Sequence, residues 1–330
     1  MARRAEQKVT DSMIRGEVYK QLEIAAAQPG WIDRVSTPAG STHDSEEYAN
    51  FNHPPIMKPR QSGNTIARPT METFTLINDE FESGAGIPAR MLRRDHAGWY
   101  NRYIADIAKR PATHWRKLLT DLLEVGTTTT ISSDGDNFFG SAHYYGDQTG
   151  QINDVAAAQV ADLNVTTPAS PTPVELVDLI LGCIGYFFGY KDTENEPIWE
   201  DNRQFHVMLP HGMAASAAKA FGKELLNNGT GTEENALVGN GTEYAVSYSI
   251  NRRLTSTTAI YLFVVDTANK GMVRQSEEIP GSGPDNVLVE TFGPGSEYFR
   301  LNEELLIKLN SSRAVGFTHN WEGSMRATLS

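Results

Sequence analysis

The strongest periodic pattern of apolar and polar positions lies between residues 90 and 126. In its first part, Trp99, Tyr103 and Ile107 recur at helical spacing, with charged residues between them. In its second part, apolar residues follow the i, i+3, i+4, i+7 spacing of one helix face, through Trp115, Leu118, Leu119 and Leu122. We therefore predict two amphipathic helices in tandem.

Pro111 lies between these two patterns. A proline removes one backbone hydrogen bond and clashes with the preceding turn, so Pro111 either kinks one long helix or separates two. Gly126 can provide a left-handed C-terminal cap, and a polar run follows it at once. An ordinary pair of core helices would show the same pattern, so the pattern alone assigns no function.

The residues in front of these helices form two contrasting segments. Residues 1–28 place Ile14, Val18 and Leu22 at helical spacing, which predicts an amphipathic helix ended by a Pro-Gly pair. Residues 36–70 are polar, rich in proline and poor in apolar residues. This composition favours weak internal structure, in a segment that is either functional or disordered. Its middle, Phe51 to Arg60, is too rich in proline for a central strand and suits an extended arm or an edge ribbon.

The middle of this arm has a one-sided charge. No acidic residue occurs from Asn50 to Arg68, whereas Lys58, Arg60 and Arg68 are positive. Such a segment cannot bury enough surface to fold alone, because an isolated two-stranded ribbon is marginal in water. If the arm is ordered, another surface must order it; a flexible surface loop is the alternative.

The remaining chain alternates between strand and helix signals. A strand is predicted over 71–80, and a small, polar linker over 148–170. A capping box with proline at the first helical position starts a helix at Thr172. Further strands are predicted at 204–209, 259–265, 286–292, 304–309 and 313–318, with an Ala-rich helix at 212–226 and a mobile loop at 227–242. The expected class is α+β.

Composition limits the possible classes of protein. A chain of 330 residues exceeds the size at which one core stops growing, so two subdomains are expected. The net charge of −12 argues against a protein whose main surface binds nucleic acid. Basic residues nevertheless gather at 90–117, as a solvated helix face or as a seam against an acidic neighbour.

No constellation of catalytic or metal-binding residues is complete. His206 and His211 are five apart, whereas a helical zinc pair needs four. Residues 134–137 open like a calcium loop, but the twelfth position is Tyr145 instead of glutamate. Cys183 lies in an apolar run, which is typical of a buried small side chain. No enzyme, cofactor, metal or membrane anchor is expected, and the N-terminus shows no secretory signal.

The order of several segments, taken together, resembles a known family. These segments are 31–36, 48–60, Phe74 to Phe81, the helical stretch, Asp134 to His143, and Glu196-Pro197 followed by 206–210 and the Ala-rich helix. In this order they are similar to the Mu-type major head (gpT-like) capsid family over about residues 31–325. The first thirty residues and 229–241 have no counterpart.

The resemblance implies the Hong Kong 97-type capsid fold of tailed phages. It implies an N-terminal arm (1–35), an extended loop (36–72), a peripheral domain (73–170) with a spine helix at 90–125, an axial domain (171–300), and a C-terminal return to the peripheral domain (301–330). The function implied is a major capsid protein whose copies form the hexamers and pentamers of an icosahedral shell around the genome.

The implied partners are further copies of the chain, with scaffold, portal and cement proteins as additional candidates. Packaged double-stranded DNA would be a neighbour only through non-specific proximity, and the protein would reside in the virion after synthesis in the host cytoplasm. Predicted contacts between subunits are Asn50, Phe51, Pro55, Lys58, Arg60, Arg68, Arg94 and Arg102. Two rivals stay open: a ring-forming tail or connector protein, and a hydrolase that uses His143 or His206.

Overall fold

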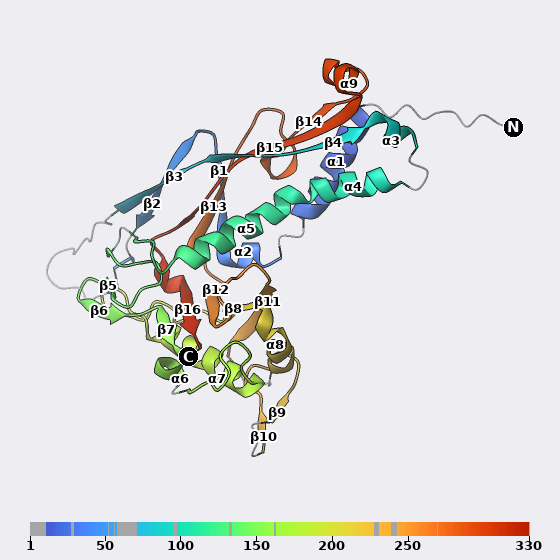
Figure 1. The fold of residues 1–330 in the computed structure, drawn as a ribbon. Coiled ribbons are helices and arrows are strands. Elements are labelled where there is room, and N and C mark those ends of the chain that lie inside the picture. Colours follow the sequence, from blue (N-terminus) through green and yellow to red (C-terminus); the bar gives the residue numbers. More distant parts are fainter. Residues whose placement is uncertain are drawn as a thin grey trace.

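The computed structural model describes residues 11–27, 30–51, 53–55, 57, 71–94, 98–131, 134–161, 163–227, 231–238, 243–268 and 270–329. It is an elongated α+β structure in which a long helical rod runs beside one sheet toward a second sheet (Figure 1). Among the helices in these ranges, none has the length and apolar character that a bilayer span requires.

The first sheet has the order β1-β13-β15-β14, and β4 also pairs with β15. Its strands are β1 (Ser36–Ser41), β4 (Asp79–Pro88), β13 (Met272–Glu277), β14 (Leu288–Phe292) and β15 (Glu304–Phe317). The 14-residue strand β15 is its centre, because β15 pairs antiparallel with β4, β13 and β14. Short helices α3 (Ala89–Arg93) and α9 (Glu297–Asn302) lie at one end of this sheet (Figure 1).

The second sheet has the order β11-β8-β12-β16-β7. Its strands are β7 (Asp154–Ala156), β8 (Gln204–Pro210), β11 (Ala245–Asn251), β12 (Ala259–Val264) and β16 (Ser324–Thr328). Every residue of β12 is buried, as predicted for the clearest apolar run. The nearby helices are α2 (Ile32–Val35), α6 (Ala157–Ala161), α7 (Pro173–Gly189) and α8 (Ala214–Ala220).

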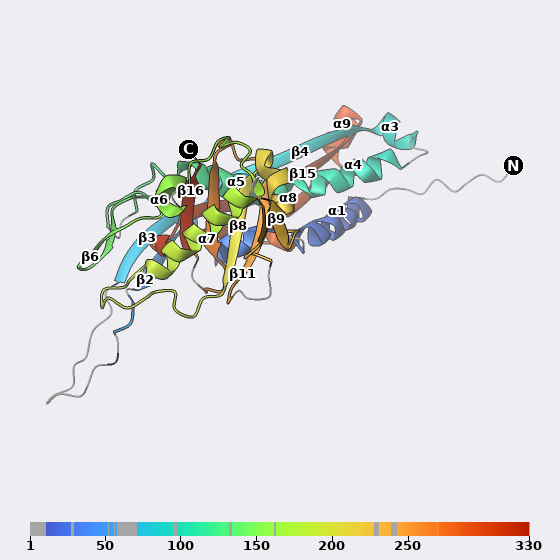
Figure 2. The same ribbon diagram turned by 90° about the horizontal axis from the view of Figure 1, so that it is seen from below.

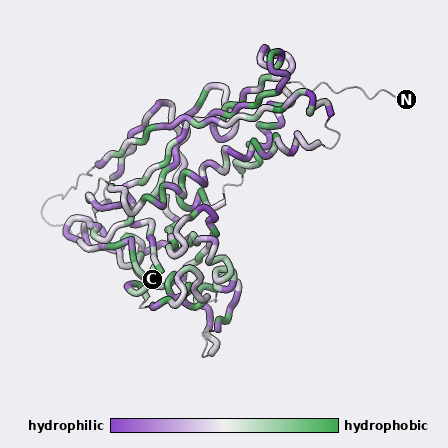
Figure 3. Tube along the Cα trace, viewed as in Figure 1, coloured by the Kyte–Doolittle hydropathy of each residue, from purple (hydrophilic) through white to green (hydrophobic). Residues whose placement is uncertain are grey.

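Helix α7 confirms the start that its sequence predicts. The Thr172 side chain accepts a hydrogen bond from the Glu175 backbone, and the Glu175 carboxylate accepts one from the Thr172 backbone. This reciprocal pair satisfies two N–H groups that a helix start leaves open. Figure 3 shows hydrophobic residues gathered around α7, where the larger core lies; Cys183 is part of that core, and burial raises the pKa of its thiol.

The rod consists of α4 (Trp99–Ala108) and α5 (Arg110–Val125). Lys109 has helical backbone angles and caps both helices, so the two follow one another almost in line (Figure 1). Pro111 lies in the first turn of α5, where its missing N–H costs nothing. Of the two predicted alternatives, Pro111 therefore separates two helices.

The apolar face predicted for the first helix is wrong. Trp99 is 67% exposed and Tyr103 is 50% exposed, whereas Ile104, Ile107 and Ala108 are buried. Helix α1 (Asp11–Ala26) decides this, because its apolar side chains cover the Ile104–Ile107 side of α4. The predicted N-terminal helix is confirmed over these residues. The face predicted for α5 is also confirmed, with Trp115 and Leu119 buried.

Several segments expected to be irregular form strands. Within 36–70, β1 lies parallel beside β13, and β2 (Ser45–Phe51) pairs with β3 (Met71–Ile77). Within 148–170, β6 (Gln148–Gln151) pairs with β5 (His143–Tyr145), and β7 joins the second sheet. Their hydrogen-bonding partners lie far away in sequence or have little apolar character, so local composition did not reveal them.

Three further predictions need correction. The tract 227–242 contains β10 (Thr232–Glu234), which pairs with β9 (Leu225–Asn227). The helix expected over 212–226 is confined to α8 and a preceding 3-10 turn (His211–Met213). The two strands expected at 304–318 are the single strand β15, because the polar residues 310–312 continue the ladder with β4.

The sheets also divide the chain differently from the predicted domain boundaries. Strands β13 and β14 lie within 171–300, but they join the sheet that contains β15. Strand β16 lies within 301–330, but it joins the sheet that contains β8 and β12. The chain therefore crosses between the two sheets more often than a simple sequence of domains would require.

A buried arginine fastens the rod to the first sheet. Arg313 of β15 is fully buried, and its guanidinium lies 4.5 Å from the centre of the Trp115 ring. It donates to the Pro111 carbonyl at 2.7 Å and to Asp285 Oδ2 at 2.7 Å. The Trp115 indole N–H also points at Asp285, 3.0 Å from each carboxylate oxygen. Burial lowers the pKa of Arg313, and the Asp285 carboxylate opposes this shift.

We expect Arg313→Ala to lower the free energy of unfolding by about 3–5 kcal/mol, because it leaves Asp285 and the Pro111 carbonyl without their partner. Urea denaturation of the subunit measures this loss. Arg252→Ala is the matched control: Arg252 is exposed, and its loss should change stability by no more than about 0.5 kcal/mol. Equal losses for the two variants would contradict the role of Arg313.

Candidate functional site

The arm root, which we define as the ribbon β2–β3, projects beside the first sheet at the end of the molecule opposite α3 and α4 (Figures 1 and 2). The rings of Tyr48 and Phe74 stack with centroids 5.3 Å apart. The Tyr48 hydroxyl donates to Gln275 of β13 at 2.6 Å. Leu76 packs so close to Gly316 that a Cβ there would lie 2.3 Å from a Leu76 methyl carbon. The root is therefore seated on its own subunit.

Both strands of the root lead to contacts with the crossover, residues 318–323, which connects β15 of the first sheet to β16 of the second. From β3, Glu72 accepts a hydrogen bond from His319 Nδ1 at 3.0 Å, and Phe74 lies against the His319 ring. Beyond β2, His53 packs edge-on against Tyr145, and its Nε2 lies 4.0 Å from Glu322 Oε1. The position of the arm root is thus linked to the place where the two sheets join.

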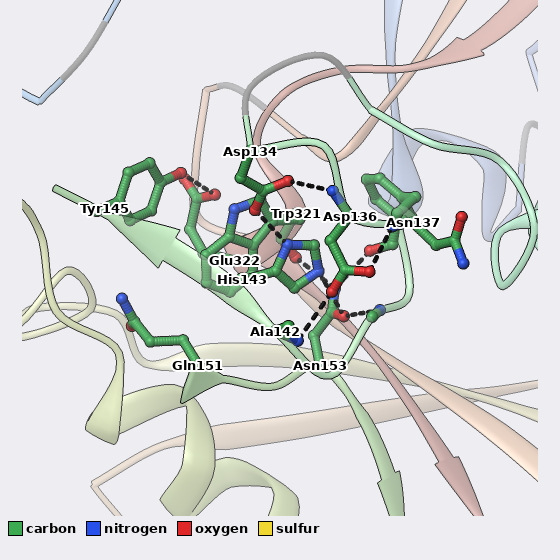
Figure 4. A network of polar contacts seen from close by, with 12 residues as sticks. Asp134, Asp136, Asn137, Ala142, His143, Tyr145, Gln151, Asn153, Trp321 and Glu322 are labelled. Atoms are coloured by element: carbon green, nitrogen blue, oxygen red, sulfur yellow. Dashed lines mark hydrogen bonds and ion pairs between the residues drawn. The ribbon is translucent and has the colours of Figure 1, made fainter. Parts of the chain in front are cut away.

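A buried polar cluster surrounds this crossover (Figure 4). His143 is fully buried, and its ring lies parallel to the Trp321 ring with centroids 4.1 Å apart. Its Nδ1 faces Asp134 Oδ2 at 2.6 Å, and its Nε2 faces Asn153 Oδ1 at 3.1 Å. Each ring nitrogen therefore has a side-chain oxygen within hydrogen-bonding distance. Burial alone would raise the pKa of Asp134, but the hydrogen bond to His143, its charge and two backbone N–H groups together lower the pKa.

Asn153 holds this cluster and the crossover together. Its amide nitrogen lies within hydrogen-bonding distance of the carbonyls of Phe138, Trp321 and Ser324, at 2.8–3.2 Å. Its amide oxygen accepts from the Gly140 backbone at 2.8 Å as well as from His143. One buried side chain therefore links the loop at 138–140, the crossover and the start of β16 through their backbone groups.

Glu322 is a buried carboxyl group at the other end of the cluster. The Tyr145 hydroxyl donates to its Oε2 at 2.8 Å, and the Tyr145 ring stacks on Trp321. Burial raises the pKa of Glu322 to about 7, although Tyr145 and the charge of His143 work in the opposite direction. Burial also raises the pKa of Tyr145, with Glu322 adding to the shift. These contacts link the crossover to β5.

The predicted contact residues fall at opposite ends of the subunit. Asn50 and Phe51 end β2, and Pro55 is exposed just beyond it. Arg94 is exposed after α3, and Arg102 is exposed on α4. The predicted contacts Lys58, Arg60 and Arg68 lie outside the described residues. Within one subunit, the structure does not bring the two groups together.

The histidines proposed for a hydrolase are both buried and engaged. The His206 ring lies between the hydroxyls of Ser247 and Ser249, each 2.9 Å from a ring nitrogen. Burial, aided by Arg34, lowers the pKa of His206 to about 3, which makes it a weak base near neutral pH. Within the described ranges, no three His, Cys, Asp or Glu side chains are grouped to hold a metal.

Sequence reasoning missed Asn153, Trp321 and Glu322, as well as the Arg313–Asp285 pair. Asn153 is 168 positions from Trp321, and no local motif marks either residue. The available signal was the run Phe-Phe-Gly-Ser-Ala-His that ends at His143, because its apolar and small residues are typical of a buried segment.

Residues 15–168 match the family described as "Mu-like prophage major head subunit gpT". The match covers 154 of the 330 residues, so nearly half of the chain is similar to this family. The resemblance predicted from the sequence is confirmed over these residues; the match begins at residue 15, within the stretch for which no counterpart was expected, and ends well before residue 325. No curated protein matches the sequence of this head subunit.

Solved structures establish the fold of this chain. It is similar to the capsid protein of cyanophage P-SCSP1u, with a TM-score of 0.56, 8% identity, and coverage of 89% of this chain and 86% of that one. It is also similar to the mature capsid protein of bacteriophage PhiM1, with a TM-score of 0.52 and 10% identity. That match covers 91% of this chain and 86% of the PhiM1 chain. The predicted Hong Kong 97-type fold is confirmed.

A third neighbour is longer than this head subunit. The bacteriophage JBD30 capsid chain matches over 91% of this chain with 12% identity and a TM-score of 0.48. This chain spans only 65% of that protein's length.

The raised pKa of Glu322 generates a prediction about pH. Because the folded subunit binds the proton more tightly than the unfolded chain, stability should fall as pH rises from about 4.5 through about 7. The full loss in the free energy of unfolding is on the order of 3 kcal/mol. Glu322→Gln carries no titrating carboxyl and should not show this loss. Denaturant unfolding of both proteins at pH 5 and pH 8 measures the difference.

The exposed residue Glu47 provides the control, since Glu47→Gln should leave the pH dependence of unfolding unchanged. If Glu322→Gln and the wild type lose stability equally between the two pH values, Glu322 is not the group responsible.

Proposed function

We propose that this subunit is the major capsid protein of a tailed double-stranded DNA bacteriophage, and that its copies assemble into the hexamers and pentamers of an icosahedral shell around the genome. The match of residues 15–168 to the gpT head-subunit family and the Hong Kong 97-type fold support this proposal. The virion would then be its final location, after synthesis in the host cytoplasm.

The main structural support for the assembly proposal comes from the arm root. Its base is seated on its own subunit through Tyr48, Glu72 and Phe74. Its strands end at Phe51 and Met71, so residues 52–70 connect them. A two-stranded ribbon is marginal by itself in water. We infer that the rest of the arm gains its stability by lying across a neighbouring subunit, with Asn50, Phe51, Pro55, Lys58, Arg60 and Arg68 as contact residues.

The two sheets suggest how the domains of the fold are distributed. The first sheet and the rod would form the peripheral domain, and the second sheet with α7 and α8 would form the axial domain near the symmetry axes. Because β13, β14 and β16 change sides relative to the predicted boundaries, the peripheral domain would include β13 and β14 and the axial domain β16.

The acidic balance fits a container for DNA. A subunit with a net charge of −12 should not hold the packaged polyanion tightly, since each neutralised phosphate adds affinity that would hinder packing and release. DNA would be a neighbour through proximity alone. Scaffold, portal and cement proteins are the further partners of this proposal.

We assign the subunit a structural role without catalytic activity. His143 is enclosed by Trp321, Asp134 and Asn153, and His206 is buried with a pKa too low for a base at neutral pH. A tail or connector protein would share the arm but would assemble into rings. Electron microscopy of the expressed protein separates the three cases: closed shells, rings or discrete small particles.

Deletion of residues 50–68 should leave a folded subunit that forms no shells, because the contact across the neighbour is lost while the root's seating on its own body remains. Electron microscopy measures shell formation, and circular dichroism with thermal unfolding measures folding.

A variant in which residues 58–68 are replaced by a Gly/Ser segment of the same length is the matched control for chain connectivity. It should also fail to assemble if the side chains of the arm make the contact. Normal particles from the deletion variant would refute the role of the arm.

A further inference from the structure

The exposed face of α4 carries an unusual stripe of side chains. Trp99, Arg102, Tyr103 and Asp106 follow the i, i+3, i+4, i+7 spacing and therefore share one helix face. Trp99 is 67% exposed and Tyr103 is 50% exposed, while the opposite face of α4 is buried against α1. Close by in sequence on α3, Met91 is 46% exposed. We call Trp99, Arg102 and Tyr103 the α4 stripe.

The residue types of the α4 stripe are typical of the centre of a protein–protein interface. Trp, Tyr and Arg are the residues most enriched among those that dominate binding energy at protein interfaces. The Arg102 guanidinium lies 5.6 Å from the centre of the Trp99 ring, a cation–π arrangement. Large aromatic side chains exposed together on a helix mark a surface that a partner covers.

The surroundings of the stripe are basic. Residues 90–117 contain eight Lys and Arg residues against two Asp residues, Asp95 and Asp106. Asp106 is already paired with Lys109 at 3.1 Å. Arg90, Arg94, Arg102 and Arg110 are all exposed. A partner of this surface should therefore be acidic as well as apolar.

The arm root, together with residues 41–44 before it and 78–80 after it, has the complementary character. Residues 41–51 and 71–80 contain six acidic residues and no Lys or Arg. Asp44, Glu47, Asp79 and Glu80 are exposed. Two large apolar side chains on β3 are exposed beside them, Met71 at 59% and Ile77 at 68%. This end of the subunit thus offers acidic and apolar groups together.

The two surfaces lie at opposite ends of the elongated subunit in both views (Figures 1 and 2), so they cannot meet within one chain. We propose that the α4 stripe of one subunit receives the acidic arm root of the next copy. The contact joins two different surfaces of identical chains, and repeated head to tail it closes into rings. This inference rests on the proposed function, and it names the self-association surface.

A charge swap tests the contact. The first variant, the stripe pair Arg94→Glu with Arg102→Glu, should lower the assembled fraction at least about tenfold. The second variant, the root pair Glu47→Lys with Glu80→Lys, should lower it equally, because each pair places like charges opposite one another. A chain with all four substitutions should recover assembly to within about threefold of wild type. Sedimentation velocity and electron microscopy of the full-length chain give the assembled fraction.

Mixing the two double variants gives a sharper result. The acidic stripe of the first variant then faces the lysine-bearing root of the second. The unchanged basic stripe of the second faces the unchanged acidic root of the first, so every contact in an alternating ring is complementary. Equal amounts of the two should therefore form even-membered rings, although neither assembles alone. Odd-membered rings cannot alternate, and finding them in the mixture would contradict the contact.

Controls separate this contact from general effects of charge. Lys219→Glu with Lys223→Glu makes the same change in net charge as the stripe pair, at exposed positions on and after α8, and should leave assembly within about threefold of wild type. All substituted side chains are exposed, so thermal unfolding of each variant should match the wild type. Trp99→Ala should also reduce assembly, whereas Leu225→Ala, at a side chain 61% exposed on β9, should not.

The outcomes distinguish the two proposals. Failure of the wild-type protein to form any assembly would overturn the proposed function. Wild-type shells together with a four-substitution chain that stays unassembled, or a control pair as damaging as the stripe pair, would overturn the head-to-tail contact alone.

Discussion

The contact among Arg313, Trp115 and Asp285 is the constraint on which the arrangement of the rod and the first sheet depends. Its members come from three elements that are far apart in the chain: β15, α5 and the turn before β14. A buried guanidinium is costly unless its hydrogen-bond donors are matched. Here the Asp285 carboxylate and the Pro111 carbonyl accept hydrogen bonds from two of its nitrogens and the guanidinium lies over the Trp115 ring, while the buried Nε has no partner among the described residues. The rod is thereby held at one place along the central strand.

The second constraint is polar and lies where the sheets join. Asn153 bonds to backbone groups of the crossover, of the start of β16 and of the loop at 138–140, and His143 is enclosed by Asp134, Asn153 and Trp321. The arm root contacts the same crossover through His319 and Glu322. An arm that is moved by a neighbouring subunit would therefore act directly on the segment that connects the two sheets.

The subunit exposes aromatic and basic residues at one end and acidic residues at the other. A chain that works alone gains nothing from such an arrangement, since exposed aromatic side chains favour association. A chain that repeats in a closed shell can cover one end with the other. This division of surface character agrees with the similarity of residues 15–168 to a family of phage head subunits.

Local patterns determined the helices α5 and α7 and the buried strand β12, because helical spacing, a capping box and an apolar run are properties of neighbouring residues. They also indicated the family through the order of its segments. The exposed face of α4 was misassigned, because Trp99 and Tyr103 are apolar enough to belong to a core and only the packing of α1 decides which face is covered. Tertiary structure alone decided the strands β1, β2 and β7, the partner of Arg313 and the cluster around Asn153, since hydrogen bonds and charge pairs between distant residues leave no periodic trace in the sequence.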